Sequence, residues 1–461
     1  MVSLHTWHSV YFLGIGGIGM SALARFFLDR GVRVAGYDLS PSDITDRLSA
    51  LGASIHFEED IAMIPDKVDM VIYTPAIRSD HAEYRYLEKR NIPFYKRSQI
   101  LGMISENYPT IAVAGTHGKT STSAMAAHIL HPEYKIMAFI GGISKNLDSN
   151  FISDAHFETI IAEADEYDRS FLTLHPQTAV ITSLDADHLD IYSVKKELEH
   201  SFQLFADQIK DGGSLVIHEK IAHSISHPCK ITYGFSKKAD LYADNIRLLP
   251  DRILFSIHDR GRFYEDITLG VPGDYNLLNA LAAYAAVTAE YTRRGKMIDP
   301  EYIFGKLATF SGVKRRFDYQ VFEKECIYID DYAHHPEEIR SLVHSVKTIF
   351  PGKNITGIFQ PHLYSRTRDF GKEFASALEL LDEIILLDIY PAREKPLKGI
   401  TSRWLAGLIR GEKTRVMNMD EVLPYLQNHK PQIVLTIGAG NIDRLVPVLK
   451  KGLSSGKRNP N

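Results

Sequence analysis

Residues 114–121 read Ala-Gly-Thr-His-Gly-Lys-Thr-Ser. The apolar run 110–113 before them is typical of a buried strand, and the run 123–130 after them is typical of a helix. A glycine turn between a strand and a helix presents backbone N–H groups and the positive end of the helix dipole to an anion. Lys119 adds a charge for the β- and γ-phosphates, and the Thr120 hydroxyl is placed to bind Mg²⁺. The segment therefore predicts a nucleotide-phosphate site.

This loop is a shortened variant of the P-loop pattern. The full pattern requires a glycine where this chain has Val113, and the chain carries Gly115 instead. An ordinary glycine-rich turn is the alternative interpretation. We favour the phosphate site because the pair Lys119-Thr120 has no packing purpose at the start of a helix.

Length and composition indicate a protein of several domains. The 461 residues are too many for one core and predict about three domains. A net charge of −4 argues against a nucleic-acid partner held by bulk electrostatics. The two cysteines do not have the spacing of a metal site, and no apolar run approaches about 18 residues. The N-terminal residues do not resemble an export signal. We therefore predict a cytoplasmic protein that does not enter a membrane.

The first domain is predicted to span residues 1–106. A strand-like run, 8–13, leads into Gly14-Ile15-Gly16-Gly17-Ile18-Gly19 and then into a helix-like run. This is the G-x-G-x-x-G turn in the context that a dinucleotide site requires, and Asp38 ends the next strand where an acid commonly binds a ribose. The domain alone suggests a nicotinamide dehydrogenase. The turn specifies only a diphosphate, however, so a UDP-linked substrate fits equally well.

The central domain is predicted to span residues 107–313. Its strand-like run 158–162 ends in Glu163-Ala164-Asp165-Glu166, and acids beside a phosphate loop suit Mg²⁺. A solvated acidic loop is the alternative. The run 178–183 is expected to form the neighbouring parallel strand, which would bring His188 to the same edge as a metal ligand. Imidazole is unusual for Mg²⁺ and indicates a second position that also accepts Mn²⁺.

Two further segments of the central domain contain candidate binding residues. Strand-rich sequence between 230 and 269 precedes an apolar helix in which Asn276 and Asn279 share one face of the first turn. The two amides could bind a base edge or cap the helix. Residues 312–317, with Arg316, could be a linker or supply a phosphate-binding arginine.

The third domain is predicted to span residues 314–461. Four strand-like runs each end in a polar loop that is followed by a helix, which predicts a second doubly wound α/β unit. One of these loops contains Asp331, His334 and His335. Another contains Arg366 and Arg368, which could clamp a carboxylate or simply pair with acids on the surface.

The chain closely resembles the Mur ligases, the ADP-forming amino-acid ligases of peptidoglycan synthesis, over essentially its whole length. The resemblance rests on these segments: 115–120, Glu163-Ala164-Asp165-Glu166, Asp187-His188, Arg315-Arg316-Phe317, 331–336 and 362–368. Within the family, residues 12–21, His117 and 390–394 are similar to the members that attach the first amino acid. Tyr275 departs from the histidine that the family often has there, which affects detailed contacts at that spot.

The resemblance implies a fold and a set of roles. The fold is α/β with three domains: N-terminal Rossmann-like, central P-loop-type ATPase with extra β-strands, and C-terminal Rossmann-like. The implied ATP-binding residues are Gly115, Thr116, His117, Gly118, Lys119, Thr120, Ser121, Asn276, Asn279, Arg316 and Asp331. The implied metal ligands are Thr120, Glu163 and His188, and the UDP-sugar residues are Gly14, Gly16, Gly17, Gly19 and Asp38. Lys119, His335, Arg366 and Arg368 are the implied catalytic residues.

The implied reaction is ATP-dependent ligation of L-alanine to the lactyl carboxylate of UDP-N-acetylmuramate through an acyl phosphate, with Mg²⁺, or Mn²⁺, as the metal. We expect a monomer or a homodimer. The nearest alternative is the related ligase that attaches a tripeptide to the same UDP-sugar in cell-wall recycling. A dehydrogenase leaves Lys119-Thr120 unexplained, and a UDP-sugar-binding regulator without catalysis leaves the ATP and metal residues unexplained.

Overall fold

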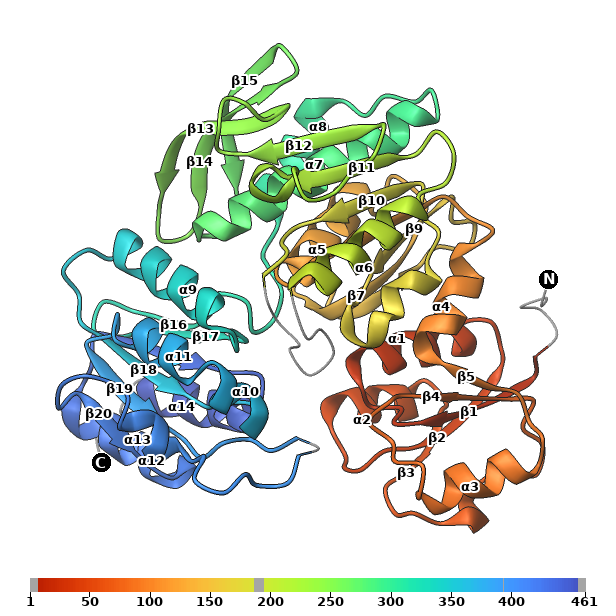
Figure 1. Cartoon of the computed structure of the whole chain (residues 1–461), viewed down its shortest axis with the longest axis horizontal. Helices are drawn as coiled ribbons and strands as arrows, with labels where there is room; N and C mark the ends of the chain where they lie inside the picture. The colour runs from red at the N-terminus through yellow and green to blue at the C-terminus, as the bar shows by residue number, and fades with distance from the viewer. Residues whose placement is uncertain (1–6, 186–194, 393, 455–461) are drawn as a thin grey trace, which may run out of the picture. The chain divides into compact units, whose positions relative to one another are not determined.

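The computed structural model describes residues 7–185, 195–392 and 394–454. In this part of the chain three separate β-sheets lie among helices, so the predicted α/β class is confirmed (Figure 1). The chain divides into two compact units. The first comprises the residues up to Ile246 with Phe255–Leu269 and Leu278–Ser311, and the second comprises Arg247–Leu254, Gly270–Leu277 and the residues from Gly312 onward.

The first sheet has the order β3-β2-β1-β4-β5 and is parallel throughout. The apolar run Ser9–Leu13 is its central strand and is fully buried, as a strand covered on both faces requires. Its strands are β1 (Ser9–Leu13), β2 (Arg33–Tyr37), β3 (Ser54–His56), β4 (Met70–Tyr73) and β5 (Phe94–Lys96). Its helices are α1 (Ile18–Leu28), α2 (Asp43–Ala50), η1 (Ile61–Met63), α3 (Ala82–Lys89) and α4 (Arg97–Ser105). The strand order changes direction at β1, because β2 and β3 lie on one side of it and β4 and β5 lie on the other. Parallel sheets bind ligands at such a point, and the turn after β1 lies there.

The second sheet has the order β15-β14-β13-β12-β11-β10-β6-β9-β7-β8. Its strands are β6 (Thr110–Ala114), β7 (Ile136–Ser144), β8 (Ser149–Ser153), β9 (Thr159–Glu163), β10 (Thr178–Ile181), β11 (Ser214–His218), β12 (Lys230–Gly234), β13 (Leu241–Leu248), β14 (Ile253–Asp259) and β15 (Arg262–Leu269). Its helices are α5 (Lys119–Leu130), η2 (Tyr167–Thr173), α6 (Lys195–Asp207), η3 (Glu219–Ile221), α7 (Asp274–Arg293) and α8 (Pro300–Thr309). The extra strands predicted between residues 230 and 269 are present.

One detail of the predicted strand order is wrong. We expected the strand that precedes His188 to lie directly beside the strand that carries Glu163. Instead, β6 lies between β10 and β9 and pairs with both in parallel. The phosphate loop therefore leaves the sheet from the middle strand of these three. Periodicity reveals strands but not their order, because pairing depends on contacts between distant segments.

The first two sheets share one hydrophobic core within the first unit. Phe26 and Phe27 of α1 belong to the same buried cluster as Phe139 of β7 and Phe151 of β8. Rings from the two regions make direct contact, with the centroids of Phe26 and Phe139 6.2 Å apart. A continuous buried core indicates that these two parts of the first unit fold against each other.

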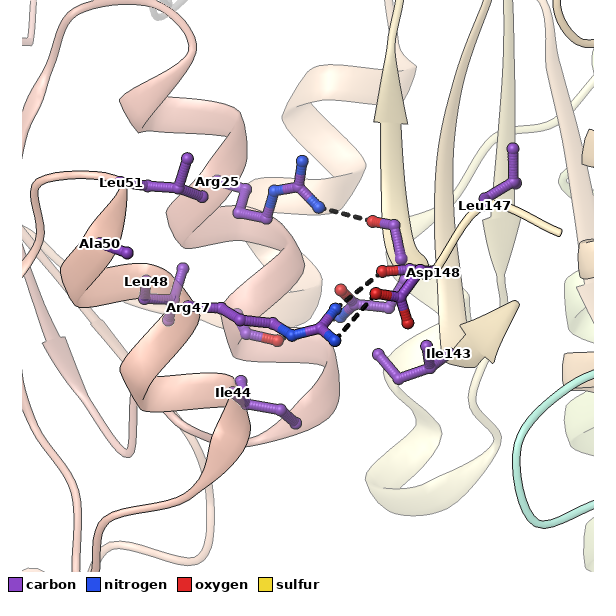
Figure 2. A pocket seen from close by; sticks show the side chains of 12 residues that line it. Arg25, Ile44, Arg47, Leu48, Ala50, Leu51, Ile143, Leu147 and Asp148 are labelled. Carbon is purple, nitrogen blue, oxygen red and sulfur yellow. Dashed lines mark hydrogen bonds and ion pairs between the residues drawn. The ribbon is translucent and has the colours of Figure 1, made fainter. Parts of the chain in front are cut away.

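Polar contacts join the same elements beside a cavity of about 390 Å³, shown in Figure 2. Arg25 of α1 donates to the Ser149 hydroxyl at 2.5 Å, and Arg47 of α2 donates to the Asp148 carboxylate at 2.9 Å. The buried amide of Asn150 donates to the carbonyl of Ile18 at 2.6 Å. The β7–β8 hairpin is thus bonded to the first turn of α1, which follows the glycine turn.

The second unit contains the sheet β16-β17-β21-β18-β19-β20, in which β16 is antiparallel and the other strands are parallel. Its strands are β16 (Asp318–Phe322), β17 (Ile327–Asp331), β18 (Ile355–Phe359), β19 (Glu383–Leu386), β20 (Thr414–Val416) and β21 (Ile433–Ile437). Its helices are α9 (Pro336–Ile349), α10 (Tyr364–Asp369), α11 (Gly371–Leu378), α12 (Ser402–Ala406), α13 (Met419–His429), η4 (Asn441–Arg444) and α14 (Leu445–Leu453). Residues 331–335, 360–368, 387–391 and 438–441 follow parallel strands, as predicted.

No helix in the described ranges is long and apolar enough to cross a membrane. Cys229 is exposed, Cys326 is partly buried, and neither forms a disulfide.

Candidate functional site

The predicted phosphate loop joins β6 to α5. Gly118 is the N-cap of α5 and adopts the left-handed conformation, with φ +82°. A Cβ atom there would lie 2.5 Å from the Asn279 side-chain oxygen, so only glycine fits. Asn279 also accepts a hydrogen bond from the Thr122 hydroxyl at 3.3 Å, which places it directly behind the loop.

The segment after β10 supports the loop from its other side. The Ser183 hydroxyl accepts the N–H of His117 at 2.8 Å and bonds the Thr116 hydroxyl at 2.9 Å. The His117 imidazole lies 3.5 Å from the Asp185 carboxylate. These contacts tie the loop to the segment that follows β10.

Lys119 and Glu166 form an ion pair in which Glu166 is fully buried and Lys119 is 14% exposed. The Lys119 ammonium donates to both Glu166 carboxylate oxygens, at 3.0 and 2.8 Å, and to the carbonyl of Gly115 at 2.6 Å. Burial by itself would lower the pKa of Lys119. The carboxylates of Glu166, Asp165 and Glu163 outweigh that effect and raise this pKa above its usual value. The ammonium therefore stays charged at the loop.

Glu163 lies at the end of β9, facing the start of α5. The Thr120 hydroxyl donates to its carboxylate at 3.0 Å, and the N–H of Gly141 donates to the same oxygen at 2.9 Å. The structure thus brings together two of the three predicted metal ligands, and the third, His188, lies outside the described residues. Within the described ranges, no three His, Cys, Asp or Glu side chains are grouped to hold a metal ion.

The acids that follow β9 separate toward different partners. Glu163 faces Thr120, Glu166 faces Lys119, and Asp165 approaches the Arg97 guanidinium at 3.8 Å. The sequence suggested one acidic group for Mg²⁺, whereas the structure gives these three acids three distinct neighbours.

The glycine turn after β1 is held by the neighbouring strand. Gly14, with φ +86°, donates to the carbonyl of Tyr37 at 2.8 Å, and a Cβ atom there would lie 2.5 Å from Thr74 Cγ2. Asp38 accepts the N–H of Gly16 at 2.7 Å. Gly17 is the N-cap of α1 and Gly19 lies in its first turn. Asp38 therefore orders the turn itself, and a ribose contact for it remains a prediction.

In the second unit, Asp331 lies at the buried end of β17. It accepts the N–H groups of Phe317 at 2.7 Å and Ala333 at 2.8 Å, and the Tyr275 hydroxyl lies 3.4 Å away. Burial raises the pKa of this carboxyl to about 6, although the Arg316 guanidinium and the two N–H groups act in the opposite direction. Tyr275, the position at which the chain departs from the family pattern, thus contacts a predicted nucleotide residue.

The two predicted asparagines both lie in the first turns of α7 and are both buried. Asn276 is buried in the second unit and donates to the carbonyl of Pro272 at 2.7 Å. Asn279 belongs to the first unit. The boundary between the units runs through the first turns of this helix. Their spacing of three residues on one buried helix start fits the predicted shared face, and their binding roles stay predictions.

The predicted amino-acid residues lie on α9 and α10. His335 is the N-cap of α9, where its Nδ1 accepts the N–H of Glu337 at 3.4 Å. Arg366 is buried, whereas Arg368 is mostly exposed and bonds Asp369 at 2.7 Å. Residues two apart on a helix face different sides. Of the two alternatives that the sequence left open, surface pairing is present at Arg368 through Asp369, and the carboxylate clamp stays a prediction.

Several contacting residues were missed by the sequence analysis. It assigned no separate role to Glu166, and it did not select Arg97, Asn150 or Ser183. Only the position of Glu166 beside Glu163 gave a usable signal, because a buried lysine at a phosphate loop requires a counter-charge. The other three residues come from distant segments and are brought to the loop and the turn by packing.

Three family models together match most of the chain. They describe the Mur ligase family catalytic domain at residues 9–109, the Mur ligase middle domain at 113–287 and the Mur ligase glutamate ligase domain at 315–440.

Known proteins resemble the chain over almost its whole length. A UDP-N-acetylmuramate–L-alanine ligase of Flavobacterium johnsoniae is 41% identical, with 98% of this chain and 99% of that protein aligned. A ligase of the same name from Cytophaga hutchinsonii is 44% identical, with 96% of each chain aligned. The crystal structure of UDP-N-acetylmuramate–alanine ligase from Thermotoga maritima superposes with a TM-score of 0.80 at 28% identity, covering 96% of this chain and 98% of that one. A murein peptide ligase from Psychrobacter arcticus shares the fold, with a TM-score of 0.69 at 20% identity over 97% and 99% of the two chains.

Proposed function

The chain belongs to the Mur ligase family, and we propose that it is an ATP-dependent, ADP-forming ligase that joins L-alanine to the lactyl carboxylate of UDP-N-acetylmuramate in peptidoglycan synthesis. The observation that carries this proposal is the identity of 41% and 44%, over nearly the whole chain, to ligases of that name. The phosphate loop and the glycine turn both fit this reaction.

The chemistry needs an activated acid, because a carboxylate is a poor acyl donor. The carboxylate attacks the γ-phosphorus of ATP, the bond to the β-phosphate oxygen breaks, and an acyl phosphate and ADP result. The amine of L-alanine then attacks the acyl carbon, and inorganic phosphate leaves. Lys119 and the N–H groups around Gly118 would offset the negative charge that gathers during phosphoryl transfer.

The residues present fit Mg²⁺. Thr120 and Glu163 place a hydroxyl and a carboxylate oxygen 3.0 Å apart beside the phosphate loop. Mg²⁺ is typically bound by one or two carboxylates together with phosphates and water. When bound, the ion would neutralise charge on the phosphates. His188 and tolerance of Mn²⁺ at a second position stay part of the proposal.

The glycine turn is proposed to hold the diphosphate of the UDP-sugar. Gly16, Gly17 and Gly19 surround the N-terminus of α1, where backbone N–H groups are available to an anion. Asp38 supports this geometry through its bond to Gly16. A cavity of about 180 Å³ extends from Gly19 to Glu163, so an acid attached to the bound sugar has space to approach the phosphate loop.

The remaining proposed roles concern the nucleotide and the amino acid. The nucleotide is proposed to contact Asn276, Asn279, Arg316 and Asp331, as the family resemblance implies. His335, Arg366 and Arg368 are proposed to surround L-alanine. If His335 is the base that takes the amine proton, Nε2 must act, because Nδ1 caps α9.

We further propose three functional domains, at residues 1–106, 107–313 and 314–461. The enzyme is proposed to act in the cytoplasm as a monomer or homodimer, without nucleic-acid or membrane partners. The two cysteines, neither of them in a disulfide, are compatible with a reducing compartment.

An ADP-release assay over a panel of acceptors tests the function. We expect ADP only when UDP-N-acetylmuramate and L-alanine are both present, with a product heavier than the UDP-sugar by one alanine residue in mass spectrometry. Glycine and L-serine measure how far the amino-acid site tolerates other side chains. Turnover with the tripeptide but not with L-alanine would instead identify the recycling ligase.

A further inference from the structure

Arg97 packs against the glycine turn from a distant segment of the chain. It is the first residue of α4, directly after β5. A Cβ atom on Gly19 would lie 2.9 Å from Arg97 Cδ and 3.1 Å from both Nε and Nη1. The guanidinium therefore lies against the first turn of α1, beside the N–H groups proposed to hold the diphosphate.

The same side chain also faces the acids of the phosphate site. Arg97, Gly19, Glu163 and Asp165 all line the cavity of about 180 Å³. Arg97 Nη2 lies 3.8 Å from the Asp165 carboxylate, which is an ion pair but too long for a hydrogen bond. The guanidinium thus has N–H donors that this acid does not engage.

Charge in this cavity points to one kind of ligand group. Among the residues that line it, Glu163 and Asp165 are negative and Arg97 is the single cation. A substrate carboxylate that approaches Glu163 and Asp165 is repelled unless cations compensate. The proposed Mg²⁺ lies at Glu163, and Arg97 is the cation beside Asp165. Arginine is suited to this task because its planar group binds a carboxylate through two parallel hydrogen bonds.

We propose that Arg97 binds the carboxylate of the UDP-sugar that is to be phosphorylated and holds it between the glycine turn and Glu163. This inference rests on the proposed function. It adds a residue that contacts the reacting acid and comes from α4, outside both glycine-rich loops. It also explains why glycine stands at position 19, since any side chain there would displace Arg97.

Calorimetric titration of the full chain without ATP tests the proposal with two ligands. UDP-N-acetylmuramate carries the acid, and UDP-N-acetylglucosamine has the same nucleotide and amino sugar without it. We expect Arg97→Met to weaken binding of the acid ligand by about 10- to 100-fold, as charged hydrogen bonds do. Binding of the ligand without the acid should change less than about twofold. Arg97→Lys should lie between, because an ammonium keeps the charge but not the planar fork.

Steady-state kinetics give a second measurement. In Arg97→Met the KM for UDP-N-acetylmuramate should rise by a similar factor, while the KM for ATP stays close to that of the wild type. Arg33→Met is the matched control, because Arg33 is exposed at the opposite end of β2 from the turn. It should leave both KM values unchanged.

Each other outcome counts against the proposal. If Arg97→Met weakened the binding of both UDP-sugars equally, Arg97 would act on the diphosphate or on folding. If the affinity for neither ligand changed, Arg97 would not contact the bound substrate. A wild-type protein that binds neither UDP-sugar would overturn the proposed function, and this inference with it. Wild-type binding without selective loss in the variant would overturn the inference alone.

Discussion

The Lys119 ammonium donates to both carboxylate oxygens of Glu166, a side chain with no exposed surface. With the carbonyl of Gly115 as a third acceptor, all three N–H groups of Lys119 have partners inside the protein. A phosphate that binds the loop must therefore compete with a carboxylate of this chain. The same pair makes the loop sensitive to the loss of either charge.

Removing one charge of the pair should destabilise the protein more than removing both. Lys119→Met leaves Glu166 buried without its cation, which should lower the free energy of unfolding by about 3–5 kcal/mol. The double variant Lys119→Met/Glu166→Leu should recover most of this loss. Thermal and urea unfolding measure the effect, with the exposed Lys89→Met as control. Equal stability of the single and double variants would contradict the expectation that the unpaired Glu166 carboxylate causes the loss.

Lys119→Ala should abolish turnover and still bind the UDP-sugar. The lysine acts on the transferred phosphate, so kcat should fall by about 10³-fold or more, as expected for a cation that stabilises the charge of a transferring phosphoryl group. Titration with UDP-N-acetylmuramate should give a Kd within about threefold of the wild type. A variant that no longer bound the UDP-sugar would show that the turn and the phosphate loop are not independent.

Glu163→Gln should weaken the use of Mg²⁺ more than it disturbs the fold. Glutamine keeps an oxygen for the Thr120 hydroxyl and the Gly141 N–H, but it loses the negative charge that a hard cation requires. We expect the Mg²⁺ concentration for half-maximal ADP release to rise about tenfold or more. A chelator should stop turnover of the wild type. If the Mg²⁺ dependence of the variant were unchanged, Glu163 would not be a ligand of the metal.

Asp331 should make the stability of the protein depend on pH. Burial raises the pKa of its carboxyl from the ordinary 3.8 to about 6, so the folded protein keeps this proton to a higher pH than the unfolded chain does. Stability from this group is complete below about pH 4 and is lost as the pH rises through about 6. The gap between the two pKa values corresponds to about 3 kcal/mol.

Comparing Asp331→Asn with the wild type at pH 4.5 and 7.5 isolates this effect. Between the two pH values the difference in free energy of unfolding should move in favour of the variant by about 2 kcal/mol, because asparagine does not ionise and about 1 kcal/mol is already lost at pH 4.5. The charged or titratable neighbours Arg316, Tyr275 and Glu338 are the same in both proteins. A difference that is equal at both pH values would contradict the raised pKa.

The bond of the β7–β8 hairpin to α1 through Asn150 should matter more for stability than its bond to α2 through Arg47. Asn150 is buried and donates to Ile18 and to Ser21, so Asn150→Ala should cost about 1–3 kcal/mol and weaken binding of the UDP-sugar. Arg47 and Asp148 are both about half exposed, so Arg47→Ala should cost less than about 1 kcal/mol (Figure 2). Unfolding of the two variants side by side measures the contrast. Similar losses in both would contradict this assignment.

Local chemistry in the sequence was sufficient for the elements and for the two loops. The apolar runs before Gly14 and Gly115 became buried strands, and both glycine turns open into helices, because strand period, turn residues and helix starts depend on near neighbours in the chain. The candidate binding residues within the loops, such as Lys119 and Thr120, could be predicted for the same reason. The α/β class followed from the alternation of these elements.

Only tertiary packing decided which distant side chains meet. It placed β6 between β9 and β10, paired Lys119 with Glu166, and separated Arg366 from Arg368 by burial. It also brought Arg97 from α4 to the glycine turn and Asn150 from β8 to α1. Contacts of this kind depend on how whole elements pack into a shared core. The sequence alone determined which chemical groups this chain carries at its turns, and the tertiary structure decided which of those groups act on one another.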